Sequence, residues 1–184
     1  MMVEARQADA VAQALLAAEL PRRWRHSVGV ARQADRLASA GGFDGDLLVG
    51  AAWLHDIGYA SQLADTGFHP IDGARHLRGL GADERLVNLV AHHSCARIEA
   101  RLRGVDALLE QEFPQDMSLP HDELCFCDQT TGPDGEVLDV IERLAEIRTR
   151  YEDGHVVRQF VDVAEPELVA TVRRIERAYP LQPR

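Results

Sequence analysis

The spacing of apolar residues is what most limits the fold of this chain, because almost every segment repeats them every three or four positions. That interval is the period of an amphipathic α-helix. Over residues 22–40, for example, Val30, Ala34 and Leu37 would share one face of a helix. No segment of useful length alternates apolar and polar residues in the way a half-buried β-strand does. The spacing therefore predicts an all-α protein.

The predicted helices follow one another along most of the chain. Their ranges are residues 3–19, 22–40, 46–56, 69–81, 82–94, 122–129, 135–149 and 153–179. Gly58 suits a left-handed turn that ends the third helix, and Pro166 would join or kink the last. A chain of 184 residues can bury a substantial core, so we expect a single-domain helical bundle. Its core would span residues 22–150, and residues 151–184 would form a C-terminal helical extension.

The composition excludes several classes of protein. A net charge of −10 argues against a surface that binds extended nucleic acid. No run of about 18 apolar residues is present, so we expect no membrane span. The three cysteines are an odd number without a disulfide framework, which suits a reducing cytoplasm. All 20 basic residues are arginine, so a bound anion would be held by guanidinium groups.

Histidine and aspartate meet at the end of an apolar run. In "AAWLHDIGYA", residues 51–60, His55 and Asp56 follow residues that a helix would bury. The chain has eight histidines, and most would fall on the inner faces or at the ends of predicted helices. A single buried imidazole is usually a core residue with hydrogen-bonded nitrogens. Several that converge with aspartates indicate a divalent metal, because such ions bind imidazole and carboxylate together.

Five stretches of the chain carry a resemblance to a known family. In order they are "RRWRHSVGVARQADRLA", "LLVGAAWLHDIGYA", "FHPIDGARHL", "VAHHS" and "LCFCDQ". They place His, His-Asp, His, His and Asp on successive helical segments. This ordered series resembles the HD superfamily of metal-dependent phosphohydrolases, of the HDIG type. The resemblance covers residues 22 to about 130 and implies a helical bundle of the HD-domain type.

The resemblance also implies a set of metal ligands. They are His26, His55, Asp56, His69, His92, His93 and Asp128. In the binuclear branch the second metal would take His69 with His92 or His93, and Asp56 would bridge both ions. His93 ranks above His92, because adjacent helical side chains diverge and relatives with one histidine there align it with His93. At the end of a helix the chain can turn so that His55 and Asp56 face one point.

The remaining histidines and cysteines have simpler interpretations. His76 lies on the same helix face as His69, and we expect it to pack or to support a ligand. His121, in a proline-containing loop, and His155, in the tail, are expected at the surface. Cys125 and Cys127 would point to nearly opposite sides of a helix, which favours core packing over a zinc site.

The implied chemistry is hydrolysis of a phosphate ester. Nitrogen and oxygen ligands suit one or two ions of iron, manganese, cobalt or nickel, with zinc or magnesium as alternatives. A metal-activated hydroxide at His55 and Asp56 would attack a nucleotide or another small phosphorylated metabolite. Arg23 lies one helical turn before His26, and Arg97 lies one turn after His93. Both are therefore candidates for binding the substrate anion. Each could instead be a solvated surface arginine.

Two departures from the family keep other functions open. Tyr59 stands where many relatives have lysine, and Ser94 stands where others have an acid, which puts a cyclic-dinucleotide substrate in doubt. One alternative is a mixed-valent di-iron oxygenase built on the same ligands. Another is a non-catalytic, metal-containing module that binds a nucleotide or a partner. Residues 98–125 and 150–184 are the segments where a substrate lid or a homodimer contact would lie.

Overall fold

The computed structural model describes residues 7–180 and confirms the all-α prediction. Its helices are α1 Ala8–Leu16, α2 Pro21–Ala38, α3 Gly45–Leu54, α4 His69–Gly79, α5 Glu84–Ala91, α6 Ala96–Arg103, α7 Asp106–Glu112, α8 His121–Gln129, α9 Val140–Arg150 and α10 Val156–Ala178. Short 3₁₀ turns include η2 Ile57–Tyr59 and η4 His93–Cys95. The first four residues of the predicted helix 3–19 lie outside the described range. Within that range, no helix is long and apolar enough to cross a membrane.

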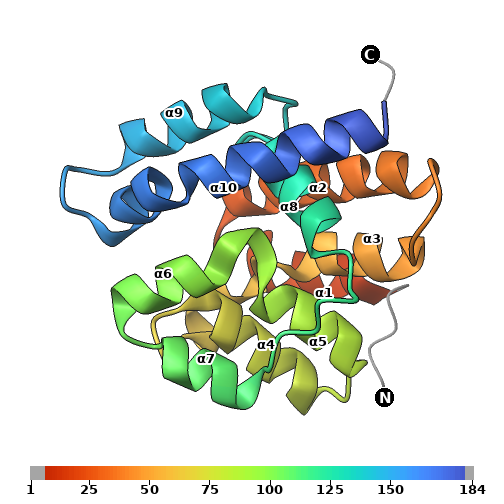
Figure 1. The fold of residues 1–184 in the computed structure, drawn as a ribbon. Helices are drawn as coiled ribbons and strands as arrows, with labels where there is room; N and C mark the ends of the chain where they lie inside the picture. Colours follow the sequence, from red (N-terminus) through yellow and green to blue (C-terminus); the bar gives the residue numbers. More distant parts are fainter. Residues whose placement is uncertain (1–6, 181–184) are drawn as a thin grey trace.

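Helix α8 lies at the centre of the molecule (Figure 1). It contacts α2, α3 and α10, and its residues from Leu124 to Gln129 are all buried. Helix α10 runs beside α9 across one side of the bundle, while α4 to α7 form the opposite side (Figure 1). A polar side chain on α8 therefore faces a space that several helices enclose, which is where bundles build metal and ligand sites.

Local signals explain where two of the site-bearing helices begin. Helix α2 starts at Pro21, whose fixed φ and missing N–H suit the first helical position. Helix α9 starts with a capping box, in which Asp139 and Glu142 each accept a hydrogen bond from the other's backbone N–H. Within the packed bundle, His26 on α2 and Arg143 on α9 are buried.

The structure gives the course of two segments for which a lid or a homodimer contact was considered. Residues 98–125 contain the end of α6, all of α7 and the start of α8. Helices α6 and α7, of eight and seven residues, are too short to show a clear period in sequence. The tail, for which one helix or two joined at Pro166 were open, forms a single helix, α10, with Pro166 inside it. Pro166 is exposed, so the backbone carbonyl that loses its hydrogen bond to the proline can be solvated and the helix continues.

The prediction for Gly58 is wrong about the cause. Gly58 is not among the glycines with positive φ, so it forms no left-handed turn. A Cβ at this position would collide with the backbone carbonyl of His69 and would lie 2.7 Å from the backbone nitrogen of Gly73. Gly58 is therefore required because the first turn of α4 packs directly on η2. This close approach brings His69 to the end of α3.

Candidate metal centre

His55 and Asp56 follow the last residue of α3, where the helix gives way to η2. His55 is fully buried and Asp56 is 3 % exposed. Asp56 has left the helical conformation, with φ −104° and ψ 3°, so its side chain need not diverge from that of His55 as it would within a helix. The His55 Nε2 atom lies 3.4 Å from the Asp56 Oδ2 atom. The chain thus turns as expected, and the pair faces one point.

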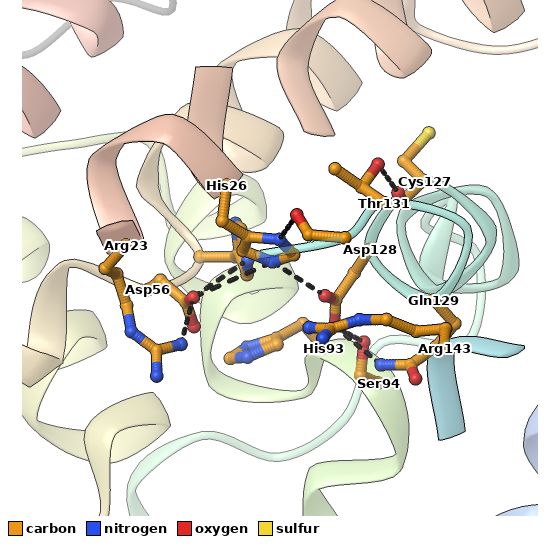
Figure 2. A network of polar contacts seen from close by, with 12 residues as sticks. Arg23, His26, Asp56, His93, Ser94, Cys127, Asp128, Gln129, Thr131 and Arg143 are labelled. Carbon is orange, nitrogen blue, oxygen red and sulfur yellow. Dashed lines mark hydrogen bonds and ion pairs between the residues drawn. The ribbon is translucent and has the colours of Figure 1, made fainter. Parts of the chain in front are cut away.

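Four other residues reach the same point from separate elements. His26 comes from α2, His69 from the start of α4, His93 from η4 and Asp128 from α8. His26 Nε2 lies 3.0 Å from Asp128 Oδ1 and 3.9 Å from Asp56 Oδ2 (Figure 2). On the other side, His69 Nε2 lies 3.5 Å from Asp56 Oδ1 and 3.1 Å from His93 Nε2.

Asp56 joins two groups of possible metal donors. Among the described residues, one such group is His26, His55 and Asp56, and the other is Asp56, His69 and His93. In each group the donor atoms lie within 4.8 Å of one another. Asp128 lies beside the first group through its contact with His26. Because each oxygen of Asp56 faces a different group, this carboxylate is placed to bridge two ions.

The hydrogen bonds of the histidines test whether these residues fit a metal. The Nδ1–H groups of His26, His55 and His93 each donate to a backbone carbonyl, at 3.1, 2.8 and 2.7 Å. In the neutral rings Nε2 then carries a lone pair, and all three Nε2 atoms point into the cluster. The buried Nε2 of His55 has no hydrogen-bond partner. This is the arrangement that fixes the tautomer of metal-binding histidines.

The electrostatics of the cluster also favour a bound cation. Burial lowers the pKa of His26, His69 and His93, so these rings are neutral donors. Burial also opposes ionisation of Asp56 and Asp128. Arg23, followed by His55, outweighs it at Asp56 and holds the pKa of that carboxyl below its usual range. His26, His55 and Arg143 do the same for the pKa of Asp128. For His55, the charge of Asp56 outweighs burial and raises the pKa. Ionised oxygens and neutral nitrogens together are a donor set that fits a divalent ion.

Asp128 is held in place by two neighbours. The Ser94 hydroxyl and the Gln129 amide both donate to its Oδ2, the amide at 2.8 Å (Figure 2). Ser94 and Cys95 have positive φ values of 47° and 60°, an uncommon conformation for residues other than glycine. The left-handed turn directs Ser94 into the site. Ser94 therefore supports a candidate ligand from the position where some relatives carry an acid.

The two predicted substrate-binding arginines have different positions. Arg23 lies in the site, where its NH1 is 2.5 Å from Asp56 Oδ2 and its guanidinium stacks 3.7 Å above the Tyr59 ring. Arg97 lies apart, half exposed and paired with Glu167 at 2.7 Å. The one-turn spacing from His93 does not hold, because the left-handed turn at Ser94 redirects the chain before α6 begins.

His92 also lies apart from the cluster. It follows the last residue of α5, and its Nε2–H donates to the Phe113 carbonyl at 2.5 Å. Its ring packs edge-on against His121. The two adjacent histidines therefore point in different directions, and only His93 joins the metal donors.

The other predictions for single residues have mixed outcomes. His155 is exposed and accepts a hydrogen bond at the start of α10, and Cys125 and Cys127 are buried as expected. His76 is half-buried, so it packs at the surface of the core. His121 is half-buried and not fully exposed as expected, and its burial lowers its pKa to about 4.

Sequence reasoning missed the arginines that α9 contributes. A cavity at the metal centre is lined by residues that include Arg23, Arg143, Arg150 and Tyr151, together with Phe160 of α10. Arg143 and Arg150 are seven residues apart in α9 and so lie on one face of it, although the helix predicted over residues 135–149 ends one residue before Arg150. The spacing of the two arginines can be read from the sequence, but their position at the metal centre follows only from the packing of α9 against the site.

Comparison with known proteins agrees with the site. Over 86 residues, 46 % of this chain, the sequence is 35 % identical to Ribonuclease Y of Mesoplasma florum, and the match spans 17 % of that protein. No solved structure matches significantly. The model of the HD domain family matches residues 23–147, a range that contains all six residues of the cluster. With its helical fold and its ordered histidines and aspartates, this chain belongs to the HD domain family.

Proposed function

We propose that this protein is a metal-dependent phosphohydrolase that cleaves a phosphate ester of a nucleotide or another small phosphorylated metabolite. The observation that carries the proposal is the position of Asp56, which joins two groups of buried metal donors and also contacts Arg23. Carboxylate and imidazole donors beside a guanidinium suit a substrate whose reacting group is an anion.

The residues around Asp56 would have separate roles. His26, His55, Asp56 and Asp128 would hold one ion, and Asp56, His69 and His93 a second. Bound divalent ions would supply a Lewis acid for the phosphoryl oxygens and a water of lowered pKa as nucleophile. Arg23 would orient the phosphoryl group through its N–H groups, because its guanidinium lies at the edge of the donor cluster.

Tyr59 offers a hydrogen-bond donor where many relatives have lysine. Its ring stacks on His69 with centroids 3.9 Å apart and lies beneath Arg23. Burial raises the pKa of Tyr59, so the phenol keeps its proton. A neutral phenol can donate a hydrogen bond to the substrate without the positive charge of a lysine, which would leave Arg23 as the main cation on this side.

The relative supports the reaction class and not the substrate. Ribonuclease Y is by name an enzyme that acts on RNA, whose linkages are phosphate esters. The match covers less than a fifth of that protein, and this chain has a net charge of −10. We therefore infer a small substrate and no extended nucleic acid.

The test is a metal analysis joined to a substrate screen. Protein purified without chelators would be assayed for bound metals, then incubated with phosphomonoesters and phosphodiesters in the presence of Mn²⁺, Co²⁺ or Ni²⁺. We expect turnover, and a loss of more than about a hundredfold in kcat/KM for Asp56→Asn. Arg97→Gln is the control, because Arg97 pairs with Glu167 outside the site. Full metal occupancy without turnover would contradict the proposal and support a non-catalytic module.

The second candidate is the mixed-valent di-iron oxygenase. Two observations favour the oxygenase. Asp56 belongs to both groups of metal donors, so two iron ions could be held side by side. Tyr59 also stands where many relatives have lysine. Iron quantification with parallel aerobic and anaerobic assays separates the two functions. Turnover that requires dioxygen would support the oxygenase, whereas equal turnover without dioxygen would support the hydrolase.

A further inference from the structure

A second cavity, which we call the arginine chamber, adjoins the metal centre. It has a volume of about 280 Å³ and is lined by Arg22, Arg23, Arg143, Arg150, Glu19 and His26 among others. Arg23, His26, Arg143 and Arg150 line the cavity of the metal centre as well. The two spaces therefore share walls, and a molecule held at the metals could extend into the chamber.

The arginines of the chamber lack enough carboxylates to neutralise them. Arg143 NH1 lies 2.6 Å from Glu146, Arg150 Nε lies 2.9 Å from it, and Arg22 NH2 lies 3.8 Å from it. Arg22 also lies 3.8 Å from Asp134, which pairs more closely with Arg25. Glu146 is thus shared by three guanidiniums, and for Arg143 and Arg150 it is the carboxylate in direct contact.

Among the arginines that line the chamber, Arg143 has a buried hydrogen-bond donor without an acceptor. It is 6 % exposed, and its buried Nε has no hydrogen-bond partner. Figure 2 shows its guanidinium extending from α9 toward the centre of the site. Buried polar groups in proteins are almost always paired, and an unpaired donor on a buried cation is especially costly. An anion bound between the two cavities would supply the missing acceptor.

The crowding of positive charge is visible at Arg150 as well. Burial lowers its pKa, and the nearby charges of Arg143 and Arg23 add to the effect although Glu146 opposes it. In a chain with a net charge of −10, such a concentration of cations does not follow from the composition. The chamber wall also contains Glu19, whose carboxylate accepts a hydrogen bond from the backbone N–H of Ser61 at 3.1 Å.

We propose that the arginine chamber binds a second phosphoryl group of the substrate, apart from the one that is cleaved, so that the substrate is a small bisphosphorylated molecule. The inference rests on the proposed function and names its substrate class. Guanidinium groups match phosphate because they donate parallel N–H groups to its oxygens. Arg23 contacts Asp56 and serves the reacting group, which leaves Arg22, Arg143 and Arg150 for the second anion.

Binding to the metal-free protein tests the chamber separately from catalysis. Chelator-treated protein would be titrated by calorimetry with adenosine 3′,5′-bisphosphate and with adenosine 5′-monophosphate. We expect the bisphosphate to bind about tenfold more tightly or better, and Arg150→Gln to remove most of this difference. Arg174→Gln is a matched control, because it removes the same charge from an exposed arginine near the C-terminal end of α10. Arg174 pairs with Asp122 of α8. Arg22→Gln gives a second variant at a half-exposed position.

Kinetics of the metal-loaded enzyme provide the second measurement. Arg150→Gln and Arg22→Gln should each raise KM for the bisphosphate, whereas Arg174→Gln should leave it unchanged. Equal binding of both nucleotides, or no effect of Arg150→Gln and Arg22→Gln, would overturn the proposal. Tighter binding of a 5′-phosphorylated oligonucleotide than of the bisphosphate would overturn the small-substrate assignment. Preferential binding without any hydrolysis would support the chamber and contradict the hydrolase function.

Discussion

Replacing Gly58 by alanine should disturb the fold and the metal centre together. The added Cβ would collide with the His69 carbonyl and crowd the backbone nitrogen of Gly73. Both obstacles are backbone atoms at the start of α4, so they cannot move aside as the tip of a flexible side chain would. Overpacking in a core typically costs about 1–3 kcal/mol, and we expect the upper end of this range. For a protein of this size, that corresponds to a fall in Tm of roughly 5–12 °C.

The same substitution should weaken the half of the site that His69 provides. If α4 moves away from η2, His69 moves away from Asp56 and His93, whereas His26 and His55 stay in place. Calorimetric titration with Mn²⁺ should then show weaker binding at the group that contains His69. Thermal unfolding of the metal-free protein measures the change in stability without the contribution of bound ions.

Gly79→Ala is the matched control, because Gly79 also lies in α4 and an added Cβ would meet no atom within 4 Å. Alanine should stabilise this helix by up to about 1 kcal/mol. A Gly58→Ala protein as stable as the unmodified chain would refute the reasoning, since it would show that α4 does not need its close contact with η2.

Three further predictions concern the ligand support, the metal and pH. Ser94→Ala removes a donor to Asp128 and should weaken metal binding by roughly 10- to 100-fold in calorimetry, whereas Ser118→Ala, at an exposed turn, should have no effect. Removing the metal with a chelator should lower Tm in a scanning assay, and adding Mn²⁺ should restore it, because the ions bind only the folded cluster; an unchanged Tm would argue against a bound ion. Burial lowers the pKa of His121 from 6.5 to about 4. As pH falls, the imidazole is therefore protonated in the unfolded chain before it is protonated in the folded protein. The free energy of unfolding should then decrease as pH falls from 6.5 to 4. Urea unfolding at several pH values should show a smaller acid loss for His121→Gln, and equal losses would contradict the assignment.

Much of the architecture follows from local patterns in the chain. The three- to four-residue spacing of apolar residues predicts helices close to those observed, since burying one face dictates which residues point inward. The ordered histidines and aspartates along those helices, through their resemblance to the HD superfamily, implied a shared centre that also included His92. Each signal acts within one helix or at its end, where the chain geometry is nearly constant.

The remaining features depend on how the helices pack, and spacing along one helix carries no information about that. His92 falls outside the cluster because α5 ends at Ala91 and the two adjacent histidines then point in different directions. Arg97 falls outside because of the left-handed turn at Ser94, and such a turn at a serine has no distinct sequence signal. Arg143 and Arg150 lie at the site because α9 packs there, although their helix face looks like an ordinary charged surface. The close contact between Gly58 and α4 likewise depends on how η2 and α4 pack together, which the local sequence does not determine. Local periodicity therefore specified most of the elements, and the resemblance to the HD superfamily implied most of the donors, whereas the mutual rotation of the helices selected which residues share the site.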